Sequence, residues 1–147
     1  MWPLIKFAHL AAAILWLGGI AFMLFALRPT LGVLAPPQRL ALAAQVLRRF
    51  FTIVWVLVLL LLASGLGMLL HAGVHDAPLG WQLMMGIGLV MFALFAHLFF
   101  APYRRLQHAV AASDWPAAGE QLKRIPPIAM TVFVLGWIAI AAVRFVG

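Results

Sequence analysis

The chain lacks cysteine and has very few charged side chains. The absence of cysteine excludes both a disulfide framework and a thiolate metal site. Only 9% of the 147 residues are charged, whereas a soluble domain keeps about 25% to solvate its surface. With 67% hydrophobic residues and a mean hydropathy of +1.12, this chain must have lipid as its main solvent. The composition therefore predicts an integral membrane protein in contact with the lipid bilayer.

Acidic residues are also scarce, and their positions exclude some functions. Asp76, Asp114 and Glu120 all lie between apolar runs, so paired-carboxylate catalysis has no support. The sequence has no Ser/His/Asp arrangement and no glycine-rich phosphate loop. The net charge of +7 does not predict nucleic-acid binding, because the basic residues lie in short connections where membrane topology explains them.

Four apolar runs are long enough to cross a membrane, which takes roughly 20 helical residues. These runs should be helices, because lipid offers no partner for unpaired backbone groups. The runs cover residues from about 3–27, 50–70, 79–101 and 127–146, with a short interfacial helix at about 115–124. Prolines stand at the ends of the runs, where helix boundaries are expected. The predicted fold is all-α, a four-helix bundle forming one membrane domain over residues 1–147.

Charge is distributed unequally among the connections between the runs. The first connection carries Arg28, Arg39, Arg48 and Arg49, and the third carries Arg104, Arg105, Lys123 and Arg124. The second connection, HAGVHDAPLG, has neither lysine nor arginine. The positive-inside rule places the first and third connections in the cytoplasm. Both termini are then expected on the outer, periplasmic side of a bacterial inner membrane.

Histidines are the side chains in or beside these runs that bind metals most readily. Ionisable groups inside a membrane usually mark a ligand, a cofactor or a pathway. A spacing of three or four places Lys6, His9 and Trp16 on one stripe of the first helix. On the third helix, His97 shares its face with small residues. An interhelical hydrogen bond is the alternative role for His9 and His97.

Depth in the membrane decides which histidines can share a ligand. At 1.5 Å per residue, His9 and His97 differ in height by roughly 18 Å, so they cannot bind one haem. His71 and His75 lie at the outer end of the second helix, near the level of His9. The sequence therefore predicts an outer site of His9 with His71 or His75, and a separate inner site at His97.

A haem b group is the first predicted occupant of the outer site. A haem needs a flat apolar slot, histidine ligands and cations for its propionates. His9 is the predicted axial ligand, His71 its partner ahead of His75, and Lys6 and Trp16 lie on the same stripe. The function would be electron transfer or membrane redox chemistry with a redox partner or a quinone. An enzyme of this kind would be a haem-dependent oxidoreductase.

Two alternatives remain open. Met68, His71 and His75, with Met84 and Met85 nearby, would suit copper(I), which prefers thioether and imidazole ligands. The chain would then be a copper-binding or copper-transport protein. A structural subunit of a larger complex is the other alternative. The helices have more small-residue faces than packing within one four-helix bundle requires. The remaining faces predict contacts between copies of the chain, and therefore a homo-oligomer.

The sequence also resembles a known family. K-x-x-H followed by LWLGG, together with RRFFTIVW, QLMMGIGLVMFALFAHLFFAPYRRL and AVAASDWPAAGEQLKRI, resembles CopD-like small membrane proteins. This group includes the copper-resistance CopD domain and the HemJ-type protoporphyrinogen oxidases. The HemJ-type likeness implies haem b, with His9 and His97 at the positions of that family's histidines. GWQLMM, however, lacks the lysine of the corresponding HemJ-type element. The CopD likeness implies copper instead.

Overall fold

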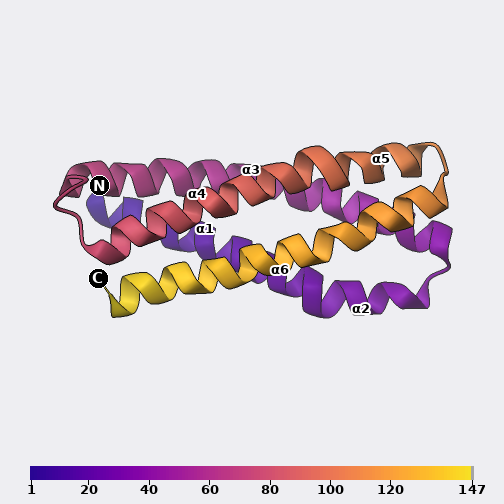
Figure 1. The fold of residues 1–147 in the computed structure, drawn as a ribbon, viewed down its shortest axis with the longest axis horizontal. Helices are drawn as coiled ribbons and strands as arrows, with labels where there is room; N and C mark the ends of the chain where they lie inside the picture. The colour runs from indigo at the N-terminus through magenta and orange to yellow at the C-terminus, as the bar shows by residue number, and fades with distance from the viewer. Residues whose placement is uncertain (147) are drawn as a thin grey trace.

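The computed structural model describes residues 1–146, and every element in that range is helical (Figure 1). The elements are α1 (Trp2–Phe22), η1 (Met23–Leu27), α2 (Arg28–Thr30), η2 (Leu31–Val33), α3 (Pro36–Ala72), α4 (Leu79–Leu98), η3 (Phe99–Tyr103), α5 (Arg104–Ala111) and α6 (Trp115–Phe145). Consecutive elements join into four long rods, each long and apolar enough to cross a membrane. The predicted all-α fold with four membrane helices is confirmed.

The rods are longer than the apolar runs that predicted them. α3 begins at Pro36, so most of the first basic connection is helical. Its added turns are amphipathic and bury Leu40, Ala43, Ala44 and Leu47, at the spacing of one helix face. The segment 115–124, predicted as a separate interfacial helix, instead forms the first turns of α6. Asp114 caps α6, accepting a hydrogen bond from the Ala117 amide at 3.3 Å.

Several prolines lie inside the rods rather than at their ends. A proline ring collides with the carbonyl four residues before it and removes one backbone donor. Pro102 lies in η3, a π-helical turn, whose wider backbone pattern accommodates that loss. Pro126 and Pro127 lie within α6, which continues through them. The expectation that these prolines end helices is therefore wrong.

The rods form two pairs of antiparallel helices. α1 packs mainly against α3, and α4 packs mainly against α6. The two termini and the turn at residues 73–78 lie at one end of the molecule, hereafter the terminal end (Figure 1). The opposite end, hereafter the basic end, carries the turns between α2 and α3 and between α5 and α6. Both termini thus lie at the same end of the bundle.

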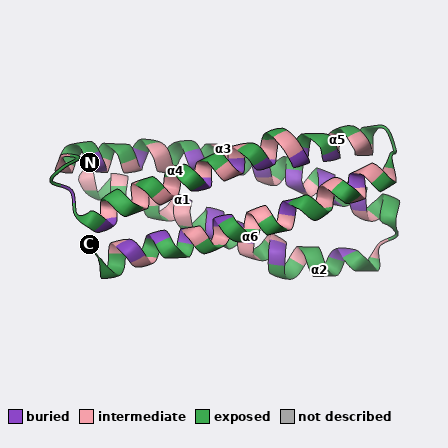
Figure 2. Cartoon of the chain, viewed as in Figure 1, coloured by how far each residue is buried: buried purple, intermediate pink, exposed green. Residues whose placement is uncertain are grey.

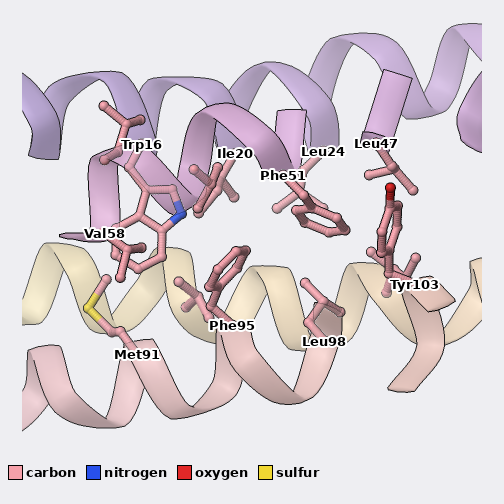
Figure 3. Packing of buried hydrophobic residues seen from close by; sticks show 14 of the residues in the cluster. Trp16, Ile20, Leu24, Leu47, Phe51, Val58, Met91, Phe95, Leu98 and Tyr103 are labelled. Carbon is pink, nitrogen blue, oxygen red and sulfur yellow. The ribbon is translucent and has the colours of Figure 1, made fainter. Parts of the chain in front are cut away.

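An aromatic core joins the two pairs in the middle and toward the basic end (Figure 3). The Phe51 ring of α3 meets Phe95 edge-on, with the ring centroids 5.7 Å apart. It also meets Tyr103, with the centroids 4.6 Å apart. Trp16 of α1 packs on Phe95 from the other side, at 6.2 Å. The core is therefore continuous across α1, α3 and α4.

Many large apolar side chains are exposed, and exposed residues occur along every rod (Figure 2). In each rod, no more than 28% of the most apolar window is buried within the chain. Large side chains such as Phe7, Leu15 and Trp137 are more than half exposed. A chain with this much exposed apolar surface needs hydrocarbon around it, which supports contact with a lipid bilayer.

Candidate functional site

A large cleft opens between the two helix pairs toward the terminal end. Its volume is about 1040 Å³, and α1, α3, α4 and α6 all contribute to its walls. We call it the terminal cleft. Its walls are mostly apolar, and the side chains with donor atoms or charges are Lys6, His9, Met68, Met84, Met85, Met91 and Arg144, together with the indoles of three tryptophans. Within residues 1–146, no acidic side chain lines it.

The imidazole of His9 is held by a polar residue on α3. His9 Nδ1 lies 2.8 Å from Ser64 Oγ, and Ser64 Oγ donates to the Leu60 carbonyl at 2.6 Å. Since the hydroxyl has one proton and directs it to Leu60, its oxygen accepts the hydrogen bond from His9 Nδ1–H. The neutral ring therefore keeps its lone pair on Nε2, the nitrogen that is left to bind a metal.

Gly65 creates the space that the imidazole occupies. A Cβ atom at Gly65 would lie 3.2 Å from His9 Cε1 and 3.8 Å from the Met85 methyl carbon. The imidazole of α1 and the thioether side chain of α4 therefore both approach the bare backbone of α3 at this glycine. A larger residue at position 65 would displace one of them.

Methionines from two helices also line the terminal cleft. Met84 and Met91 are seven residues apart, so they lie on the same face of α4, with Met85 beside them. Met68 lies one turn beyond Ser64 on α3. Thioethers and a neutral imidazole are ligands that favour copper(I). In the part of the chain that the structure describes, no group of three or more His, Asp or Glu side chains is placed to hold a metal ion.

His71 lies elsewhere on the same pair of helices. Its ring packs against that of Trp2 in a tilted arrangement, with the centroids 4.4 Å apart. Trp2 precedes His9 by two helical turns on α1, and His71 follows Ser64 by two turns on α3. The Trp2–His71 pair therefore lies about 10 Å closer to the terminal end than the His9–Ser64 pair. The structure does not bring the His71 ring beside His9.

The other predicted site residues are distributed around the cleft. Lys6 lines it, and its ammonium lies over the Trp2 ring, 5.4 Å from the centroid. Trp16 is buried and forms part of the wall. His75 lies exposed in the turn at the terminal end, and His97 lies on the exposed face of α4. Among His71, His75 and Met68, only Met68 lines the cleft.

Three residues important to this site were not identified from the sequence. The sequence does not identify Ser64 as the partner of His9. Gly65 can be predicted only to permit close helix packing, and Met91 has no predicted role. A lone serine in an apolar run is a signal that a polar group must be near, but its partner depends on the register between α1 and α3.

Comparison with protein families gives a match over most of the chain. The family model for copper resistance protein D matches residues 44–146, which span most of α3 and all of α4, η3, α5 and α6. α1, with His9, lies outside the matched range. Neither the curated proteins nor the solved structures gave a match. Since the matched range is well over half of its length, the chain belongs to the copper resistance protein D (CopD) family.

Proposed function

We propose that this protein handles copper in the membrane by binding copper(I) in the terminal cleft. His9 Nε2 and the thioethers of Met84 and Met85 are the proposed ligands, with Met68 and Met91 close by. The observation that carries the proposal is the His9 imidazole, hydrogen-bonded to Ser64 and lying in a methionine-lined cleft. Membership of the copper resistance family supports copper as the metal.

The chemistry of the cleft suits a soft ion of low charge. Copper(I) binds thioether sulfur and imidazole nitrogen, and these neutral ligands are available without deprotonation. The two nearby cations do not have to approach the ion. Lys6 and Arg144 are exposed side chains near helix ends, where long chains extend toward the membrane interface. The position of the Lys6 ammonium over Trp2, toward the terminal end, agrees with this.

The copper alternative is better supported than the haem b prediction. Among the described residues, His9 is the one histidine that lines the terminal cleft. The predicted second axial ligand, His71, packs against the Trp2 ring instead. The family match points to copper resistance and carries no indication of haem. Electron transfer with a redox partner or quinone therefore has no specific support.

Competition for copper(I) with a chromophoric chelator tests the proposal. Purified protein in detergent under reducing conditions should take up about one copper(I) per chain. His9→Ala and the double variant Met84→Leu/Met85→Leu should each weaken binding by about tenfold or more, because each removes proposed ligands of the ion.

Matched controls use the same residue types outside the cleft. His97→Ala and Met130→Leu alter exposed side chains that do not line it, so both should bind copper(I) like the parent protein. An unchanged affinity in His9→Ala, or an equal loss in His97→Ala, would contradict the assignment. A Soret band in purified protein that does not bind copper would overturn it in favour of haem.

A further inference from the structure

A second cavity lies at the basic end of the bundle. Its volume is about 300 Å³, within the range of about 300–1,000 Å³ typical of ligand sites. We call it the basic cavity. Most of its wall is apolar and comes from α1, η1, α3, α4 and α6. Three cationic side chains complete the wall: Arg28, Arg39 and Lys123.

These cations come from three separate elements. Arg28 is the first residue of α2, Arg39 lies in the first turn of α3, and Lys123 lies on α6. Within the described range, no acidic side chain lines the cavity. Glu120 lies 3.5 Å from Lys123, but this exposed pair on one helix face neutralises only one of the three charges. The fold thus brings together an excess of positive charge, and a bound anion would reduce the electrostatic repulsion among these side chains.

The interior of the cavity is apolar. Leu24, Leu47, Phe51 and Leu98 line it and belong to the buried core. Trp16 lines both this cavity and the terminal cleft, so its indole stands between them. A copper ion would be repelled by the three cations, so this space does not extend the proposed copper site. The combination fits a molecule with an anionic head and an apolar chain.

The position along the bundle identifies the kind of anion. α3 has 37 residues, which span roughly 55 Å at 1.5 Å per residue. A bilayer with its headgroup layers is about 40–45 Å thick, so the ends of α3 reach the headgroups or beyond. We therefore expect Arg39, near the start of α3, to lie in or beyond the headgroup layer, where lipid phosphates are available, while the cavity interior extends toward the hydrocarbon.

We propose that the basic cavity binds one acidic phospholipid. Its phosphate is held by Arg28, Arg39 and Lys123, and one acyl chain enters the apolar interior. Arginine and lysine bind phosphate through charge-assisted hydrogen bonds. This proposal does not depend on copper binding, which takes place in the terminal cleft.

Native mass spectrometry and thermal unfolding of the purified protein test the proposal. In a neutral detergent, phosphatidylglycerol should bind at one molecule per chain and raise the Tm by several degrees more than phosphatidylcholine. The variant Arg28→Gln/Arg39→Gln/Lys123→Gln should lose the bound phosphatidylglycerol and this extra rise. The control Arg49→Gln/Arg104→Gln/Arg105→Gln removes equal charge from residues outside the cavity wall and should retain both. Equal loss in the control would overturn the proposal, because diffuse surface charge would then explain the binding.

A second variant blocks the cavity without changing its charge. Gly119 lines the cavity, and a Cβ atom there would meet no heavy atom within 4 Å. Gly119→Leu places an apolar side chain in the wall and favours the helix, so it should fold and yet exclude the acyl chain. Phosphatidylglycerol binding as strong as in the parent would contradict the proposal. A Tm rise with inorganic phosphate equal to that with phosphatidylglycerol would also contradict it, since a free anion would then suffice.

Discussion

At the scale of single residues, the copper proposal depends on one hydrogen bond between two helices. Ser64 fixes the tautomer of His9 because its own proton goes to the Leu60 carbonyl. Ser64 therefore acts on the metal site through His9 and is a positioning residue. Partners of this kind commonly change metal affinity by about 10–100-fold.

Ser64→Ala should weaken copper(I) binding within that range of about 10–100-fold without unfolding the protein, because it removes the acceptor for His9 Nδ1. The chelator competition described above measures the change. Thr52→Ala is the control, since Thr52 donates to the Arg48 carbonyl at 2.9 Å on an exposed face. If the two variants lose the same affinity, or if Ser64→Ala loses none, the positioning role is wrong.

At the scale of helices, glycines set how closely the rods cross. A side chain at Gly136 of α6 would collide with Leu17 of α1, and one at Gly19 would collide with the Phe50 ring of α3. Small residues at such crossings let backbones approach, and packing rather than hydrophobicity holds membrane helices together. These crossings keep α1 in place between α3 and α6, which positions His9.

Gly136→Val should lower the stability of the bundle by about 1–3 kcal/mol, because the added methyl groups overpack the contact with Leu17. Thermal unfolding in detergent measures this as a lower Tm. At Gly67, by contrast, a Cβ atom would meet nothing within 4 Å, so Gly67→Val is the matched control and should unfold near the parent Tm. Equal Tm values for the two variants would show that the α1–α6 crossing is not tight.

The elements also show what can and cannot be read from the sequence. Hydropathy predicts the four membrane helices, because each helix that crosses the hydrocarbon needs a long apolar run. It does not predict where the rods end, because the turns before residue 50 continue by amphipathic packing of Leu40, Ala44 and Leu47. His9 is predictable as an ionisable group in an apolar helix. Its partner is not, since Ser64 and His71 share one face of α3 and only the register with α1 distinguishes them.

At the scale of the whole molecule, both termini lie at the terminal end, and the basic connections lie at the other end (Figure 1). The side of the membrane that each end faces follows from charge. Cytoplasmic connections carry an excess of lysine and arginine. We therefore expect the terminal cleft to open toward the periplasm and the basic cavity toward the cytoplasm.

The absence of cysteine makes this orientation simple to test. Val74→Cys places one thiol in the exposed turn at the terminal end, and Ala112→Cys places one in the exposed turn at the basic end. A membrane-impermeant maleimide should label Val74→Cys in intact bacteria, and Ala112→Cys only after the membrane is broken. The reverse pattern would invert the orientation and place the cleft on the cytoplasmic side.

The proposed copper(I) site joins one imidazole and thioethers in the terminal cleft. X-ray absorption at the copper K-edge of the copper-loaded protein tests this proposal, because it identifies the atoms around the metal. We expect a copper(I) edge with a mixed shell of one imidazole nitrogen and at least one thioether sulfur, with the nitrogen lost in His9→Ala and sulfur lost in Met84→Leu/Met85→Leu. A shell of nitrogen and oxygen alone, unchanged in both variants, would contradict it.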